Sequence, residues 1–411
     1  MEADFSKVEE SLNYLMNQPF TSGAGIGLHG GEPTLVPHTT LEKYIKLAES
    51  YNKPNGNTTT IVTNGSRITP KLVKLFKKYN MSVAVSADGP PHLNILRGPD
   101  PSDEEITRVY NKSLMNAIKL LRKNKIPTSI MCVLHTENCG NDEKLMELTD
   151  WLDTLAAMGV TGGRLNQLES NFPWTDKYEL SNERLIEVYS YLFEWNNSNK
   201  LRYLPMREWV DNLLGYGNSP CIYGECDWYQ TNTTSILPDG TITNCDRTFG
   251  EGLHCIGEGA KGSRQSALLQ TEEECEGCKY WTVCYGGCPS EARDGDWRNK
   301  TKFCEMTYGM YEFIENKLRG LFPNIKLKID ENYSDPFIAM SYAYNTRCSS
   351  WGNYKPRVNN QTSNTSSPAG IGELVPKDQL PSDLDPNLPW RYAPGGYHAD
   401  QHTDIPGGDQ Q

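Results

Sequence analysis

Two features that commonly mark membrane or nucleic-acid partners are missing from this 411-residue sequence. It has no apolar run of about 18 residues, so we expect no membrane span. Positive charge is scarce, with 40 Lys and Arg against 52 Asp and Glu. Such an acidic chain is a poor partner for a phosphate backbone, and we expect no nucleic-acid partner. The first residues, MEADFSKVEESLNYL, lack the regions of an export signal, which predicts a cytoplasmic protein.

Cysteine is absent from residues 1–131 and is then concentrated in one part of the chain. Nine of the 12 cysteines lie from Cys221 to Cys304. A disulfide framework is disfavoured because the sequence lacks an export signal. Clustered cysteines in a reducing cytoplasm more often bind metal.

The spacing of these cysteines predicts two metal sites. The pattern is Cys221-x4-Cys226, thirteen residues to Gly240, four more to Cys245, then Cys275-x2-Cys278-x5-Cys284-x3-Cys288, and finally Cys304. Eight thiolates make two full sets for [4Fe–4S] clusters, which we favour from spacing and ligand softness. Two all-cysteine zinc sites remain the alternative. Cys255 stands apart and is interpreted as a core thiol, whereas Gly240 predicts a turn that returns Cys245 beside Cys226.

Residues 1–200 alternate between strand-like and helix-like segments. The strand-like runs are 25–28, 59–62, 82–85, 128–134 and 163–165, and the helical patterns cover 5–15, 41–51, 70–79, 110–124, 142–158 and 182–196. This βαβ rhythm predicts an α/β fold with a parallel sheet, as a full or partial barrel. In such a barrel the site lies at the carboxyl ends of the strands.

The rest of the chain divides into two further parts. Residues 201–325 combine short elements with many cysteines and glycines, which predicts a second, metal-stabilised domain ending in a helix over 305–321. Residues 326–411 form a C-terminal extension. From about residue 349 it is rich in Asn, Ser, Pro and Gly and lacks an apolar period, which predicts disorder.

The cysteine pattern resembles the SPASM domain of radical SAM enzymes. Cys221 also resembles an additional ligand of anaerobic sulfatase-maturating enzymes and peptide-modifying relatives. The resemblance implies two auxiliary [4Fe–4S] clusters, the first held by Cys221, Cys226, Cys245 and Cys288 and the second by Cys275, Cys278, Cys284 and Cys304.

Gly30-Gly31-Glu32-Pro33 follows the apolar run GIGLH and resembles the GGEP motif of radical SAM barrels. In that family the backbone and the Glu carboxylate receive the amino group of S-adenosylmethionine. The chemistry suits these residue types, because glycines permit close approach of the backbone and a carboxylate pairs with an ammonium.

Two further strand ends resemble segments of the same family. Asn64 belongs to a TNG segment, and Ser86 opens the segment SADGP. The resemblance implies that Ser86 contacts the ribose or carboxylate of the cofactor. It implies the same neighbourhood for Arg97, for which a solvated surface charge is the alternative. The predicted fold is therefore a partial TIM-like (β/α)6 radical SAM barrel followed by a SPASM domain.

One family motif is missing. Radical SAM enzymes carry C-x3-C-x2-C after the first barrel strand, upstream of GGEP, but no cysteine precedes Cys132 here. Cys132 and Cys139 have the wrong spacing, and we interpret them as a buried thiol and a loop thiol. Residues 1–20 match the helix that follows the first strand, so that strand is missing too. We favour a truncated record, because an exposed sheet edge is a liability; a degenerate homologue ranks second and a separate chain third.

The resemblance also implies a function. The complete enzyme would modify a peptide or protein through 5′-deoxyadenosyl radical chemistry, with an electron donor such as flavodoxin or ferredoxin. A third [4Fe–4S] cluster requires the missing segment. Asp246, directly after Cys245, resembles the proposed general base of sulfatase-maturating enzymes, and a turn or capping role is its alternative. The competing hypothesis is a non-catalytic iron–sulfur protein that binds peptides or transfers electrons.

Overall fold

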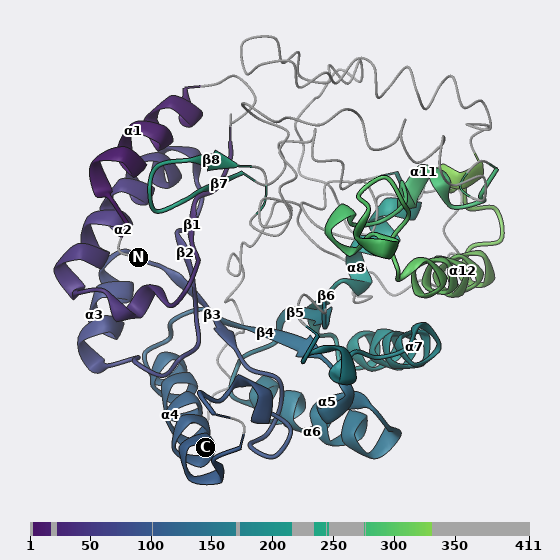
Figure 1. Cartoon of the computed structure of the whole chain (residues 1–411), viewed down its shortest axis with the longest axis horizontal. Helices are drawn as coiled ribbons and strands as arrows, with labels where there is room; N and C mark the ends of the chain where they lie inside the picture. Colours follow the sequence, from purple (N-terminus) through teal and green to yellow (C-terminus); the bar gives the residue numbers. More distant parts are fainter. Residues whose placement is uncertain are drawn as a thin grey trace, which may run out of the picture. The chain divides into compact units, whose positions relative to one another are not determined.

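A computed structural model gives the fold of the chain (Figure 1). It describes residues 3–17, 23–100, 102–169, 173–215, 234–243, 245, 275 and 277–330. Cys221, Cys226, Cys255 and Asp246 lie outside these ranges, as does the extension beyond residue 330.

The chain forms a six-stranded sheet, which confirms the predicted α/β class. Its strands follow one another in chain order, and β1 to β4 are paired in parallel. The strands are β1 Gly27–Leu28, β2 Thr60–Thr63, β3 Ser82–Ser86, β4 Thr128–Leu134, β5 Gly162–Gln167 and β6 Arg202–Leu204. The first five were predicted from apolar runs. β6 was missed, because three residues are too few to show a periodic signal.

The described helices are α1 Phe5–Met16, α2 His38–Asn52, α3 Pro70–Lys78, α4 Glu104–Lys123, α5 Thr136–Cys139, α6 Asp142–Ala157, α7 Asn182–Ser198, α8 Met206–Leu213, α11 Trp281–Cys284 and α12 Cys304–Leu321. Seven of them confirm the predicted helical segments, although α4 begins at Glu104 and not at residue 110, whereas the short helices α5, α8 and α11 were not predicted. Side chains at Asp4, Thr69 and Asp103 accept hydrogen bonds from the first turns of α1, α3 and α4. These caps satisfy N–H groups that have no partner within the helix and so fix where each helix begins. None of the described helices has the length and apolar character to cross a bilayer.

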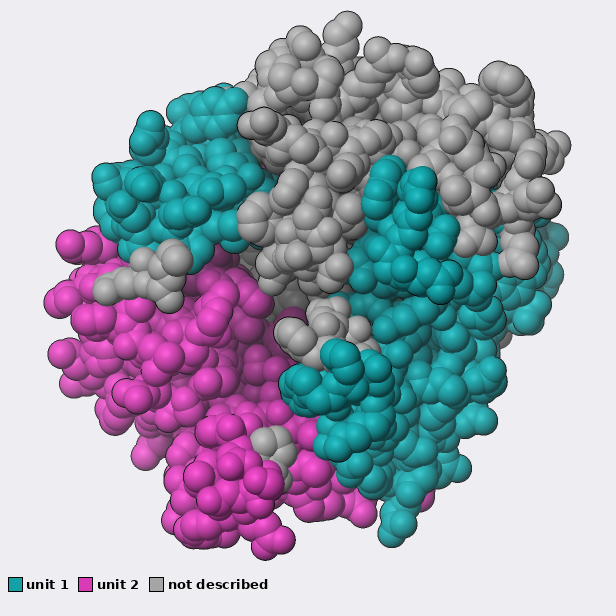
Figure 2. All heavy atoms as spheres, viewed as in Figure 1, with its two compact units in different colours: residues 1–22, 134–145, 165–394 teal, residues 23–133, 146–164, 395–411 magenta. Residues whose placement is uncertain are grey.

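The chain divides into two compact units (Figure 2). Unit 1 contains residues 1–22, 134–145 and 165–394, and unit 2 contains residues 23–133, 146–164 and 395–411. Unit 2 therefore carries β1 to β3 and most of β4, whereas the described cysteines from Cys245 onward belong to unit 1. The predicted domain boundaries at residues 200 and 325 stay predictions.

The two faces of the sheet in unit 2 differ in burial. One face is fully buried and includes Ile61, Val83, Val85, Ile130 and Cys132. The other is half-buried at Thr60, Val62, Ser86, Ser129, Met131 and Val133, although Ser82 and Ala84 on the same face are buried. The register places Ser86 opposite Met131, so both lie on this second face. Side chains there remain accessible to a ligand. Cys132 is the buried thiol that was predicted.

In unit 1, α1 lies against the hairpin of β7 Ser235–Ile236 and β8 Ile242–Thr243. The Oγ of Ser11 donates to the carbonyl of Gly240 at 2.5 Å. Gly240 has φ +87°, and a Cβ there would lie 2.8 Å from the Cβ of Lys7. The predicted turn at Gly240 is confirmed, and only glycine fits it without strain. Cys139 was predicted in a loop, but it ends α5 and is buried.

Candidate functional site

The loop after β1 begins with two glycines in left-handed conformations. Gly30 has φ +90° and Gly31 has φ +41°. Apart from the neighbouring residues, no heavy atom of the described part of the chain lies within 4 Å of where a Cβ would stand at either position. The backbone here is therefore open on the side that a side chain would otherwise cover, as close approach of a ligand requires.

Glu32 joins this loop to the end of β2. Its Oε1 accepts from the Oγ1 of Thr63 at 2.7 Å and from the N–H of Thr34 at 3.0 Å, while its Oε2 accepts from the N–H of Asn64 at 2.6 Å. The hydroxyl of Thr34 donates to Oε1 as well. An ionised carboxylate has about four acceptor positions, so the chain itself uses most of them. Glu32 thus fixes the loop, and its expected contact with the cofactor's amino group stays a prediction.

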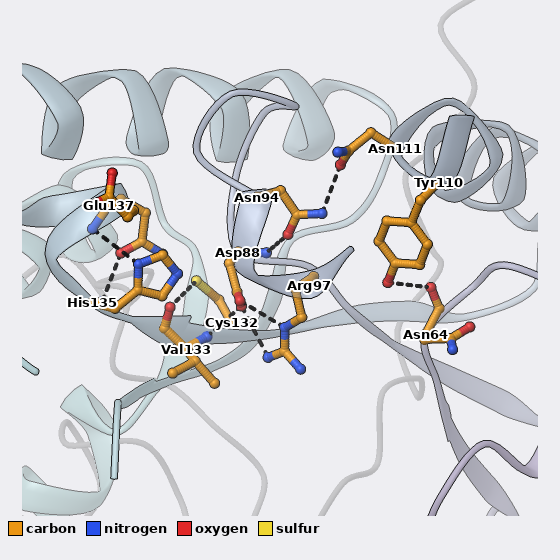
Figure 3. A network of polar contacts seen from close by, with 11 residues as sticks. Asn64, Asp88, Asn94, Arg97, Tyr110, Asn111, Cys132, Val133, His135 and Glu137 are labelled. Carbon is orange, nitrogen blue, oxygen red and sulfur yellow. Dashed lines mark hydrogen bonds and ion pairs between the residues drawn. The ribbon is translucent and has the colours of Figure 1, made fainter. Parts of the chain in front are cut away.

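A buried ion pair stands at the end of β3. The carboxylate of Asp88, with a side chain only 3% exposed, accepts from the Nε of Arg97 at 2.7 Å and from its Nη2 at 3.0 Å (Figure 3). The N–H of Val133 in β4 donates to the same carboxylate at 2.7 Å. Burial by itself lowers the pKa of Arg97, but the charge and hydrogen bonds of Asp88 outweigh it and raise the pKa. The alternative of a solvated surface charge at Arg97 is therefore wrong.

Two buried asparagines support this pair (Figure 3). The side-chain oxygen of Asn94 accepts from the N–H of Asp88 at 2.6 Å, and its amide donates to Asn111 of α4 at 2.7 Å. Asn111 in turn donates to the carbonyl of Thr107 at 2.9 Å. Every step is a hydrogen bond between buried groups, so Asp88 and Asn94 are tied to α4.

The same region reaches the end of β2. The hydroxyl of Tyr110 in α4 donates to the carbonyl of Asn64 at 3.2 Å, and burial raises the pKa of Tyr110. The side-chain oxygen of Asn64 accepts from the N–H of Ser66 at 2.9 Å. The structure thus brings Glu32 and Asn64 into contact, with Ser86 two residues before the anchored Asp88. Asp88, Asn94 and Asn111 were not predicted as site residues.

Four cysteines of unit 1 lie close together in the cysteine-rich part. Burial raises the pKa of Cys284 to about 12, and the nearby thiol of Cys304 adds to the rise. The thiols of Cys278 and Cys275 act on Cys284 in the same direction. Cys275 and Cys278 also pack with Trp281 in one apolar cluster. This set is the one that the family resemblance assigns to the second auxiliary cluster.

The chain between Cys284 and Cys304 has an unusual backbone. Tyr285, Gly286 and Gly287 all have positive φ, at +49°, +78° and +72°. A Cβ on Gly287 would collide with the side chain of Thr301. The N–H of Thr301 donates to the carbonyl of Gly286 at 2.8 Å, and the N–H of Cys304 donates to that of Thr301 at 3.1 Å. These contacts hold Cys304 beside the turn that follows Cys284.

The four described cysteines offer a donor set that suits either an iron–sulfur cluster or zinc. Within the described ranges, no three His, Cys, Asp or Glu side chains converge closely enough to hold one metal ion. The choice between the two kinds of centre stays a prediction. For the first set, Cys245 and Cys288 are half-buried and their partners lie outside the described residues, so that set stays a prediction.

Comparison with known proteins agrees with this geometry. Residues 3–152 match the family model of the radical SAM superfamily. A cysteine-type anaerobic sulfatase-maturating enzyme of Clostridium novyi (strain NT) is 24% identical over 315 residues, which cover 70% of this chain and 80% of that protein. A serine-type anaerobic sulfatase-maturating enzyme of Klebsiella aerogenes is 21% identical over 313 residues, 72% of each chain.

A solved structure shows the same fold. Native anSMEcpe with bound AdoMet and Cp18Cys peptide has a TM-score of 0.59 and 18% identity, over 78% of this chain and 91% of that one. The chain therefore contains a radical SAM domain, and the matches indicate an enzyme. Its similarity in sequence is to the anaerobic sulfatase-maturating enzymes.

Proposed function

We propose that this chain is a radical SAM/SPASM protein that takes part in the post-translational modification of a peptide or protein. The observation that carries the proposal is the polar edge of the radical SAM domain, where Glu32 fixes the loop after β1 and Asp88 orients Arg97. The relatives are named for the maturation of sulfatases, and one similar structure holds AdoMet and a peptide. Both support a peptide or protein substrate here.

In this proposal the side chains at the strand ends bind S-adenosylmethionine. The open backbone of Gly30 and Gly31 lies against its amino group, and the hydroxyl of Ser86 contacts its ribose or carboxylate. Asp88 engages two of the five N–H donors of Arg97. The remaining donors would be available to the cofactor's carboxylate, a group that an arginine recognises well.

The cysteines of unit 1 hold the auxiliary centres. Cys275, Cys278, Cys284 and Cys304 bind one [4Fe–4S] cluster, and Cys221, Cys226, Cys245 and Cys288 bind the other. When bound, S-adenosylmethionine and a reducing cluster supply hydrogen-atom abstraction, while the protein positions the reactants and excludes water. Asp246 is the proposed base that accepts the substrate's proton.

A second candidate rests on one observation, the absence of cysteine from residues 1–131. Residues 1–131 contain no C-x3-C-x2-C motif that would hold the radical-generating cluster. In this reading the chain binds peptides or transfers electrons through its auxiliary clusters and relies on another protein for catalysis.

The two functions are separated by one assay on the anaerobically reconstituted chain. It is reduced with dithionite in the presence of S-adenosylmethionine and a cysteine-containing peptide, and 5′-deoxyadenosine and the mass of the peptide are followed. Product formation supports the enzyme. About eight bound irons without product refute a self-sufficient enzyme and favour the second candidate.

A further inference from the structure

The first segment of unit 2, residues 23–133, has a net charge opposite to that of the chain as a whole. It contains fifteen Lys or Arg and eight Asp or Glu, whereas the complete sequence has 40 and 52. A local excess of one sign within an oppositely charged protein creates a field that attracts a complementary partner.

Helix α3 carries the densest part of this charge. Its nine residues, PKLVKLFKK, hold four lysines and no acidic residue. Leu72, Val73 and Phe76 are buried and attach the helix to the unit. The opposite side is exposed and, with one residue of the preceding loop, forms what we call the α3 basic stripe: Arg67, Lys71, Lys74 and Lys77.

Folding stability does not explain this stripe. Lys78, next to it, pairs with Glu42 at 2.6 Å, but no described acidic side chain pairs with the four residues of the stripe. Like charges three residues apart on a helix repel each other. Lys71 also lies in the first turn, near the positive end of the helix dipole, where a cation is unfavourable. Lys77, in the last turn, is favoured by the dipole, but no described ion pair offsets the repulsion among the four like charges.

The stripe begins beside the candidate cofactor site. Arg67 lies in the loop that follows β2, three residues after Asn64, whose N–H contacts Glu32. From Lys71 to Lys77 the helix rises only about 9 Å. A contact surface of that length suits the rim of a small globular protein. A membrane surface or a nucleic acid would also meet the negative charge of the remaining chain.

We propose that the α3 basic stripe docks a small acidic electron-transfer protein that carries a flavin or an iron–sulfur cluster. This rests on the proposed function, which needs an external one-electron donor. The donor loses one electron and an iron–sulfur centre of the chain gains it, and no covalent bond changes. The stripe raises the rate of encounter by electrostatic steering and selects for an acidic partner.

The test measures binding apart from catalysis. Oxidised bacterial flavodoxin is titrated into the reconstituted chain by isothermal calorimetry at low salt. The variant K71E/K74E/K77E should bind at least about tenfold more weakly, and the difference should shrink as salt rises. A matched control, K7E/K200E/K326E, makes the same charge change at exposed lysines of unit 1 and should bind like the wild type. Circular dichroism verifies that all three proteins fold.

Each outcome either supports or overturns the proposed docking site. An equal loss in the control variant would show that only net charge matters, and wild type that binds neither flavodoxin nor an acidic ferredoxin would overturn the proposal. Wild type that instead binds phosphatidylserine vesicles or duplex DNA through the stripe would also overturn it. Stripe-dependent flavodoxin binding without 5′-deoxyadenosine would leave the docking site standing while the self-sufficient enzyme fails.

Discussion

Replacing Asp88 by asparagine tests the buried pair that orients Arg97. Asp88 is 3% exposed and accepts from two nitrogens of Arg97 and from the N–H of Val133. The amide keeps the shape but removes the negative charge, so the guanidinium loses its counter-charge. Breaking a buried pair in this way costs about 3–5 kcal/mol. Because the side chain of Arg97 is 27% exposed, water offsets part of the loss, and we expect about 2–3 kcal/mol for D88N.

Two measurements follow the substitution of Asp88, one of the stability of the whole chain and one of a single backbone amide. Urea unfolding gives the change in free energy, and D88A, which removes both oxygens, should speed hydrogen exchange of the Val133 amide. R97M removes the cation, so the double variant D88N/R97M should be less destabilised than the sum of the two single variants, with a coupling of about 1–3 kcal/mol. Additive effects of D88N and R97M would refute the role assigned to Asp88.

Three further substitutions test other parts of the account. C304S should lose about four irons per reconstituted chain, whereas C139S, at a buried thiol outside the set of Cys275, Cys278, Cys284 and Cys304, should lose none. About two zincs without labile sulfide in the wild type would establish the zinc alternative. G287A should lower iron content and thermal stability because its Cβ would collide with the side chain of Thr301. G295A, also at positive φ but with no described atom near its Cβ, should lower the free energy of unfolding by only about 1 kcal/mol. Equal effects of the two substitutions would contradict the packing argument. E32Q should weaken S-adenosylmethionine binding about tenfold in calorimetry. One of the four hydrogen bonds that fix the loop is lost when the new amide N–H group faces the N–H of Asn64, which is also a donor. The control E42Q, at the partly exposed pair with Lys78, should have no effect.

The sequence predicted seven of the described helices and the first five strands because their signals are local. Periodic apolar residues and caps such as Asp4 and Thr69 lie within the segments that they define. The open backbone of the GGEP loop was also predicted from the sequence, and Gly30 and Gly31 do adopt left-handed conformations. Such features depend on a few neighbouring residues.

The features that were missed depend on distant contacts. Asp88 and Arg97 are nine residues apart, and their pairing requires the loop that Asn94 and Asn111 hold, together with the N–H of Val133. No periodic pattern of apolar residues in the sequence indicates such a contact. The assignment of Cys304 to the set of Cys275, Cys278 and Cys284 likewise came from family resemblance and not from spacing.

Binding of S-adenosylmethionine to the reconstituted chain is the most direct test of the central claim. We predict saturable binding in calorimetry that R97M weakens by at least about tenfold, since a charge-assisted contact to a carboxylate contributes about 1.5–3 kcal/mol. R108M is the control, because Arg108 forms only an exposed pair with Glu105, and it should bind like the wild type. Absence of binding, or equal binding by wild type and R97M, would contradict the account.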